Sequence, residues 1–388
     1  MKKIVLAFFV LFCGALACFV SLNAPTKAVF AQDNPEFDAK AICLMEYNSD
    51  QVLLEKNADA SVPVASIVKL MTILITIEQI EDGKLGLNDQ VVASHNAAGM
   101  GGSQVFIEAG GSYTVDEMLK SVIVSSANDA SVVLAETIAG SESKFVEMMN
   151  KRAGELNLNG TVFANSTGLP ASQHSCARDI AKLLKAVTGH ELYHKYSTIW
   201  MDKLTHKGGR DTELVNTNKL IRYFEGCDGG KTGSTNEAGY CLAATAKRGD
   251  MRLIGVVLGA KNSTTRFVAA SGLLNFGFSN FENKKLIESG EILQTLEIKG
   301  GKTPLEAISK DDITVLGQKG DDESISTKID ITGSLKAPVI KGDKVGVVYM
   351  IKGGIVVGES DILAKDTVKH TKISDNIMKI IEKWQIAS

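Results

Sequence analysis

The sequence carries little net charge and has no closely spaced pair of cysteines. Its 42 basic and 45 acidic residues leave a formal net charge of −3, so the charge balance gives no reason to propose a nucleic-acid partner. Four cysteines follow the apolar N-terminal segment (Cys43, Cys176, Cys227 and Cys241), and none forms a C-x-x-C pair. A zinc site built on paired cysteines is therefore unsupported, and we expect four unpaired thiols.

Two nucleotide-binding motifs are also missing. The glycine-rich stretch at Gly99–Gly102 is no dinucleotide fingerprint, because no βαβ unit surrounds it. Gly230–Thr232 looks like the end of a phosphate-binding loop, but Glu225 stands where that loop requires glycine. The sequence therefore predicts neither a dinucleotide nor a nucleoside triphosphate as cofactor.

One stretch does match a metal motif. Residues His190–His194 read H-E-x-x-H, which binds zinc when it lies on a suitable helix. The nearest downstream candidates for a third ligand are His206 and Glu213, which lie around a predicted break at Lys207–Gly209. We favour a surface helix with two histidines, and we predict no metal and no cofactor.

The N-terminus has the pattern of a signal peptide. Lys2 and Lys3 precede an apolar run over Ile4–Leu22, and Val29–Ala31 supplies small residues at the usual cleavage offsets. We predict a signal peptide over residues 1–31, and hence an exported protein at the outer face of the cytoplasmic membrane or in the cell wall. An uncleaved anchor and a lipid-anchored start at Cys18 are the alternatives.

The length and the apolar content of 44% suggest two domains with sizeable cores. Periodicity and capping residues predict a hairpin over residues 37–56, and a strand pair over 239–246 and 252–258. Thr114 and Glu117 form a predicted capping box at the start of a helix. The predicted helices cover residues 66–83, 114–124, 129–139, 144–156, 178–187 and 265–277.

The tail of the chain has a different character. Short predicted strands, separated by Gly, Asp and Lys turns, cover residues 293–298, 313–316, 325–331, 345–350 and 354–357. They lack histidine, tryptophan and acidic clusters, so we predict a small all-β sandwich without chemistry of its own. Residues Ile373–Ile386 have an apolar helical face, which favours an interfacial helix on a membrane surface over a helix packed on its own protein.

The chemistry is predicted to centre on Ser66 and Lys69. Pro63 and Ser66 are good helix-start residues, so Lys69 lies one turn further along and faces the same way. A serine hydroxyl is a weak nucleophile unless a base takes its proton. A lysine becomes such a base when burial and a second cation lower its pKa.

Two further motifs indicate which chemistry this serine–lysine pair performs. Ser126–Asn128 (S-A-N) lies at a predicted helix–helix junction, and Lys231–Gly233 (K-T-G) lies on a predicted edge strand, where the glycine lets a substrate backbone approach. The order S-x-x-K, S-x-N, K-T-G is typical of penicillin-binding proteins and class A β-lactamases.

From about Phe37 onward the chain resembles the serine-type D-alanyl-D-alanine carboxypeptidases, which are low-molecular-mass penicillin-binding proteins. The similarity rests on the stretches ASIVKLMT, SSANDAS, NSTGLPASQHSCARD, DGGKTGSTNEAGYCLAA and MRLIGVVLGA. It implies an α/β (α+β) serine transpeptidase/β-lactamase-like domain over residues 32–280. A β domain over 281–366 and a C-terminal helix over 367–388 would follow.

The resemblance also implies roles for single residues. Ser66 would be the acylated nucleophile, Lys69 its base, and Ser126 the relay of the proton to the leaving D-alanine. Asn128 would hold the substrate amide and the lysine. The substrates would be peptidoglycan stem peptides that end in D-Ala-D-Ala, with β-lactams as covalent inhibitors.

The remaining implied roles concern the substrate carboxylate and the oxyanion. Lys231 would face the terminal carboxylate and keep Lys69 neutral, Thr232 would hydrogen-bond that carboxylate, and Arg266 would pair with it. The backbone N–H groups of Ser66 and Ser234 would form the oxyanion hole. For Arg266, whose role rests on the resemblance alone, the alternative is a surface arginine at the start of a helix.

Three other functions stay open at this point. A class A β-lactamase needs a glutamate in an E-x-x-L-N loop to activate the deacylating water, but this chain has Ala153 in that place before Leu156–Asn157. An endopeptidase that cuts peptidoglycan cross-links shares the same motifs. A catalytically silent envelope-binding protein is the third alternative, although all of the residues that the chemistry needs are present.

Overall fold

The computed structural model describes residues 37–170, 172–320 and 324–371. The predicted signal peptide and the predicted helix over 373–386 lie outside the described residues. Residues 367–371, which we assigned to the C-terminal helix segment, are not helical. Val368 forms a β-bridge with Val339 and His370 forms one with Gly301, so backbone pairing continues at least this far.

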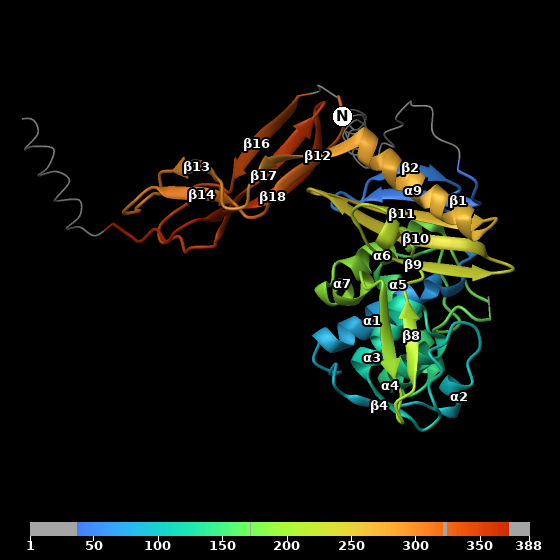
Figure 1. The fold of residues 1–388 in the computed structure, drawn as a ribbon. Coiled ribbons are helices and arrows are strands. Elements are labelled where there is room, and N and C mark those ends of the chain that lie inside the picture. Colours follow the sequence, from blue (N-terminus) through green and yellow to red (C-terminus); the bar gives the residue numbers. More distant parts are fainter. Residues whose placement is uncertain (1–36, 171, 321–323, 372–388) are drawn as a thin grey trace, which may run out of the picture. The chain divides into compact units, whose positions relative to one another are not determined.

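An antiparallel five-stranded sheet lies at the centre of the first part of the chain (Figure 1). Its strand order is β2-β1-β11-β10-β9, with bounds β1 Ala41–Glu46, β2 Val52–Lys56, β9 Cys227–Thr235, β10 Gly239–Arg248 and β11 Met251–Ala260. The predicted hairpin and strand pair are confirmed. The K-T-G motif lies on β9 at the edge of the sheet, as predicted, with Lys231 opposite Ala243.

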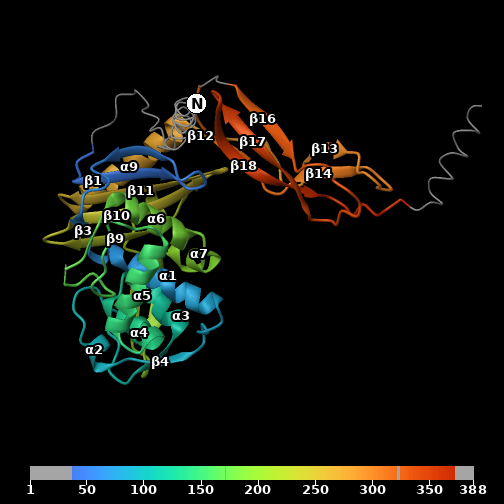
Figure 2. The same ribbon diagram turned by 180° about the vertical axis from the view of Figure 1, so that it is seen from behind.

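Helices cover the two faces of this sheet, and both views show them (Figures 1 and 2). Helix α9 (Ser263–Asn280) packs on β10 and β11 from one side, and α6 (Ala177–Thr188) packs on the same strands from the other. Apolar side chains from both layers are buried, including Leu253 and Leu274 on the α9 side. The sheet therefore has no exposed face along these strands.

A group of helices packs beyond α6 and carries two of the three motifs. A 3₁₀ turn over Ala65–Val68 leads into α1 (Lys69–Glu81), which contacts α3, α4, α5 and α6. The predicted capping box of Thr114 and Glu117 is confirmed at the start of α3. The other bounds are α2 His95–Ala98, α3 Val115–Ser125, α4 Asn128–Ala139, α5 Glu142–Glu155, α7 Glu191–Ser197 and α8 Leu220–Tyr223.

Three small antiparallel pairs connect these helices. They are β3 (Val62–Pro63) with β6 (His174–Ser175), β4 (Gln90–Val92) with β5 (Ser112–Thr114), and β7 (Met201–Thr205) with β8 (Asp211–Val215). None of the three was predicted, because runs of two to five residues give little periodicity to read.

The second part of the chain is all β, as predicted. A five-stranded sheet has the order β13-β14-β18-β17-β16, and a two-stranded sheet pairs β12 with β15. The two sheets share one apolar core that includes Ile287, Val348 and Ile362, so the small sandwich is confirmed. The bounds are β12 Phe281–Ile287, β13 Ile292–Leu296, β14 Leu305–Ser309, β15 Ile313–Gln318, β16 Ile325–Ile331, β17 Lys344–Lys352 and β18 Ile355–Ala364. We missed β12 and β14, which are polar or short.

Among the described residues, no helix is both long enough and apolar enough to cross a membrane.

Candidate active site

The 3₁₀ turn brings Ser66 and Lys69 together at the start of α1. The Lys69 Nζ lies 3.0 Å from the Ser66 Oγ and donates a second hydrogen bond of 2.6 Å to the Thr167 carbonyl oxygen. Lys69 is completely buried at the start of the helix. The predicted serine–lysine pair is therefore formed within one turn of the chain.

The environment of Lys69 favours the uncharged amine. Burial is the main cause that lowers the pKa of Lys69 well below its usual range, and the positive charge of Lys231 lowers it further. The carboxylate of Asp129 acts in the opposite direction with a smaller effect. A neutral amine at hydrogen-bond distance from a hydroxyl is able to accept its proton.

Ser126 lies between α3 and α4 and points toward the edge strand. Its backbone has the left-handed conformation, with φ of 62°, which ends α3 and turns the chain into α4. The Lys231 Nζ donates hydrogen bonds of 2.7 Å to the Ser126 Oγ and 3.1 Å to the Thr232 carbonyl oxygen. The S-x-N and K-T-G motifs are thus joined by a direct contact between side chains.

Lys231 is also buried, and this affects its ionisation. Desolvation, with a contribution from the positive charge of Arg266, lowers its pKa to about 7. Two lysines in one dry site therefore both have depressed pKa values.

Asn128 is the first residue of α4 and is nearly fully buried. Its amide nitrogen donates to the Gly101 carbonyl oxygen at 2.6 Å, and the contact with the lysine that the resemblance implied is not formed. Its Oδ1 is buried and has no hydrogen-bond partner within the described part of the chain. A buried acceptor of this kind is able to receive an N–H group of a ligand.

The K-T-G strand packs directly against the turn that carries Ser66. A Cβ atom on Gly233 would lie 3.0 Å from the Ser66 backbone nitrogen and 2.8 Å from the Val64 carbonyl oxygen. Only glycine permits this approach. Thr232 is buried and Ser234 is exposed, so the strand passes from the interior to the surface beside Ser66.

Arg266 is not a surface residue, which corrects the alternative considered above. It is 7% exposed, and its Nη1 donates to the carbonyl oxygens of Gly233 and Cys241, both at 3.3 Å. Its guanidinium lies 4.6 Å from the centre of the Phe267 ring. The Asn262 cap starts α9 so that Arg266, one turn along, faces β9 and β10 rather than solvent.

Sequence reasoning missed three contributors to the site. Thr167 supplies the carbonyl oxygen that accepts a hydrogen bond from Lys69. Gly168, with φ of +93°, lies so close to the turn that carries Ser66 that a Cβ atom on it would be 2.4 Å from the Ala65 carbonyl oxygen. Asp129 accepts hydrogen bonds from the backbone N–H groups of Val105 and Ile107. The N-S-T-G-L-P stretch is recognisable as a loop, but only packing brings it to Ser66.

The H-E-x-x-H histidines do not converge on a common point. His190 contacts Glu81 at 2.7 Å, and the His194 Nε2 lies 3.0 Å from the Thr188 carbonyl oxygen. His206 is buried against the Tyr113 hydroxyl. The described residues contain no group of three or more side chains that would hold a metal ion. The four cysteines are buried free thiols, as expected.

Ala153, which stands in the place of the β-lactamase glutamate, lies inside α5 and is buried. The segment is therefore a helix rather than a loop, and it offers no carboxylate at this position.

Comparison with known proteins agrees with this geometry. Residues 28–262 match the family model described as D-alanyl-D-alanine carboxypeptidase, of the type called peptidase S11. Residues 281–370 match the model described as the C-terminal domain of penicillin-binding protein 5.

Whole-chain relatives give the same result. The chain is 38% identical to the D-alanyl-D-alanine carboxypeptidase DacF of Bacillus subtilis over 89% of this chain and 90% of that protein. It is 33% identical to DacC of Escherichia coli, which carries the same description, over 96% of each. Its structure is similar to that of penicillin-binding protein 5 from Haemophilus influenzae, with a TM-score of 0.73, 29% identity and coverage of 87% of this chain and 100% of that one.

Proposed function

This chain belongs to the D-alanyl-D-alanine carboxypeptidase family and is a serine hydrolase of peptidoglycan metabolism, and from this premise we propose that Ser66 is its nucleophile. The observation that carries the proposal is the 3.0 Å contact between the Ser66 Oγ and the buried Lys69 Nζ. Its chemistry suits a hydroxyl that must lose a proton as it attacks a carbonyl.

In the acylation step, the Ser66 oxygen attacks the carbonyl carbon between the last two D-alanines while Lys69 takes the hydroxyl proton. The backbone N–H groups of Ser66 and Ser234 stabilise the oxyanion, an effect worth about 2.7–4 kcal/mol of barrier in a serine hydrolase. The C–N bond then breaks, and Ser126 relays the proton that Lys69 took to the nitrogen of the leaving D-alanine, which leaves Lys69 neutral again. Water hydrolyses the ester and restores the Ser66 hydroxyl.

Recognition of the substrate follows from the cations around this pair. Lys231, Thr232 and Arg266 bind the terminal carboxylate, and Gly233 lets the substrate backbone approach the strand. The unpartnered Oδ1 of Asn128 accepts the substrate amide N–H. β-Lactams use the same contacts and acylate Ser66. The resulting ester is hydrolysed slowly, because Ala153 supplies no carboxylate to activate water.

The setting of the enzyme is proposed largely from sequence patterns. Residues 1–31 form a signal peptide, residues 32–280 the catalytic domain and residues 281–371 the β domain, whose end was predicted at 366 and is extended by the bridges of Val368 and His370. The helix over 373–386 attaches the enzyme to the outer face of the cytoplasmic membrane.

The test is release of D-alanine from a stem pentapeptide that ends in D-Ala-D-Ala, measured for the wild type, Ser66→Ala and the exposed control Ser61→Ala. We expect release by the wild type and by Ser61→Ala, and none by Ser66→Ala. Labelling with penicillin and mapping of the modified peptide should place the adduct on Ser66. Release by both the wild type and Ser66→Ala, or by neither, contradicts the proposal.

The same assays separate the alternatives. Rapid penicillin turnover would indicate a β-lactamase. Cleavage of cross-linked peptides in preference to the pentapeptide would indicate an endopeptidase. Loss of activity on addition of a chelator would indicate a metal-dependent reaction that involves His190 and His194.

A further inference from the structure

The three residues that precede Lys231 form an irregular part of the edge strand. Two of them are glycines, Gly229 and Gly230, which have no side chains to anchor the chain. Gly230 has φ of +141°, and a Cβ atom there would lie 2.4 Å from the Ala243 carbonyl oxygen. The pairing of β9 with β10 also shifts register next to Gly229. The strand is therefore least regular directly before Lys231, whose side chain it has to orient.

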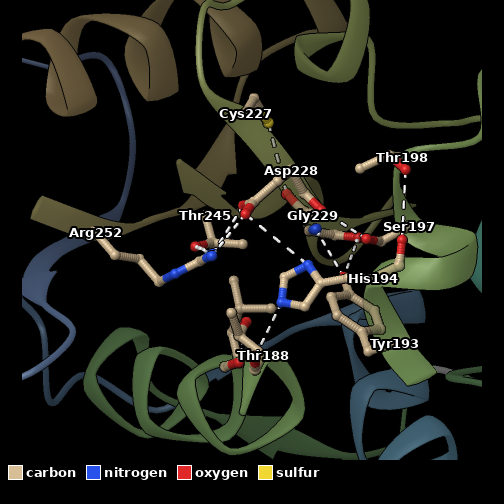
Figure 3. A network of polar contacts seen from close by, with 12 residues as sticks. Thr188, Tyr193, His194, Ser197, Thr198, Cys227, Asp228, Gly229, Thr245 and Arg252 are labelled. Atoms are coloured by element: carbon tan, nitrogen blue, oxygen red, sulfur yellow. Dashed lines mark hydrogen bonds and ion pairs between the residues drawn. The ribbon is translucent and has the colours of Figure 1, made fainter. Parts of the chain in front are cut away.

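Helix α7 holds this irregular segment from outside the sheet. The Tyr193 hydroxyl accepts a 2.8 Å hydrogen bond from the Gly230 N–H and donates one of 3.3 Å to the Gly230 carbonyl oxygen. One turn later, the Ser197 hydroxyl donates to the Asp228 carbonyl oxygen at 2.6 Å. Figure 3 shows these two α7 side chains beside the strand. A single phenol thus satisfies both backbone groups of the residue before Lys231.

Asn218 and Arg252 also hold residues 228–230, and together with Tyr193 and Ser197 they form a clamp on this segment. The Asn218 amide donates to the Gly229 carbonyl oxygen at 3.1 Å. The Asp228 carboxylate pairs with Arg252 of β11 at 2.7 Å and lies 3.9 Å from the His194 Nδ1 (Figure 3). Every carbonyl oxygen from Asp228 to Gly230 therefore receives a hydrogen bond from a side chain.

Tyr193 fits this position closely. It is fully buried, and a Cβ atom on Gly229 would lie 2.8 Å from its ring, so the glycine is needed to admit the ring. Burial raises the pKa of Tyr193, which keeps the phenol protonated and able to donate.

We propose that Tyr193 is a positioning residue that fixes Gly230, and through it aims the ammonium group of Lys231 at Ser126 and at the carboxylate of the substrate. The inference rests on the function proposed above, which gives Lys231 its role. Tyr193 itself touches neither the substrate nor the reacting atoms.

Loss of the clamp has a predictable electrostatic effect. The charged group that acts on Lys231 is Arg266 from α9, and Lys231 in turn lowers the pKa of Lys69 from α1. Those around Tyr193 are Asp228, Arg252 and the Cys227 thiol. When Gly230 is released, Lys231 gains contact with water and its pKa rises from about 7 toward the usual value. Lys231 then keeps its proton to higher pH, but its ammonium group is held less firmly toward Ser126 and the substrate carboxylate.

The experiment compares Tyr193→Phe, which removes only the hydroxyl, with Tyr196→Phe as the matched control. Tyr196 is a buried tyrosine on the same helix, and its hydroxyl contacts Asp116 and Lys195 instead of β9. The second-order rate of Ser66 acylation by benzylpenicillin is measured between about pH 5 and pH 10, with D-alanine release as a second readout.

For Tyr193→Phe we expect about a tenfold lower maximal rate, as the loss of one buried hydrogen-bonding group implies, and an alkaline limb displaced to higher pH. Tyr196→Phe should keep the profile of the wild type. An unchanged profile for Tyr193→Phe, or the same displacement in both variants, overturns the inference while leaving the proposed function intact. If penicillin does not modify Ser66 in the wild type, the proposed function has failed instead.

Discussion

The two described regions of the chain bury very different side chains. Residues 37–280 bury Lys69, Lys231, Arg266 and Asp129, each at most 7% exposed. Among the described residues from 281 onward, the buried polar side chains are only Ser309 and Ser360. Burial of a charge costs several kcal/mol unless partners offset it. The comparison shows that this cost is concentrated in the region that carries the chemistry.

The charged groups of the β region lie at its surface instead. Lys344 pairs with Asp361, and Lys365 pairs with Glu306, with all four side chains at least one-third exposed. Such exposed pairs contribute little to stability. By contrast, the buried Lys231 and Arg266 beside the K-T-G strand form a preorganised site for an anionic ligand.

The largest effect is expected when a buried cation of the site is removed. Lys231→Met should lower the rate of Ser66 acylation by about 10²-fold or more, because the ligand carboxylate and Ser126 both lose a charged donor. The matched control is Lys344→Met, which removes an exposed lysine from the β region and should leave acylation unchanged. Equal losses of acylation rate in the two variants would contradict the conclusion that the buried lysine of the first region, and not an exposed lysine of the β region, serves the chemistry.

Lys231→Met should also raise the stability of the protein, by about 1–4 kcal/mol, since it relieves a buried charge. The pKa of Lys231 is about 7 in the folded state and higher in the unfolded chain, so both states are protonated and the penalty is complete only well below pH 7. As pH rises above 7, the folded wild type loses the proton first and gains stability. The advantage of the variant should therefore shrink between about pH 7 and pH 10 in denaturant unfolding.

A smaller effect is expected from Gly168→Ala, because the added methyl group would press on the Ala65 carbonyl in front of Ser66. Strain of about 1–3 kcal/mol and a reduced acylation rate should follow. Gly83→Ala is the control, since Gly83 also has a positive φ but nothing lies within 4 Å of its added Cβ. It should lose stability without slowing acylation. If both variants acylate equally, contact of the 167–168 loop with Ser66 is unimportant for the reaction.

The smallest effect on chemistry is expected from the core of the β region. Ile362→Ala removes a fully buried side chain from that core and should destabilise the region by about 2–5 kcal/mol. The acylation rate at a temperature below unfolding should stay that of the wild type. Unfolding by denaturant and penicillin labelling of the same samples provide the two readouts. A slower reaction in a still folded sample would link the β region to the chemistry.

The sequence by itself determined most of the longer elements and the motif residues of this protein. Apolar periodicity, the Thr114 capping box and the spacing of Ser66 and Lys69 are local features, because they depend on residues within one or two turns of each other. The strand pair and the edge position of Lys231 followed from alternation and from the turn between β10 and β11. For the same reason, short or polar strands such as β12 and β14 were missed.

Only the tertiary structure decided how far each side chain is buried and what it contacts. Arg266 could have been a surface residue by its sequence, and its packing against β9 and β10 shows that it is not. The Thr167 carbonyl on Lys69 and the Tyr193 hydroxyl on Gly230 join residues 98 and 37 positions apart. The pKa values of the two lysines depend on exclusion of water and on neighbouring charges, which arise only when distant segments pack together.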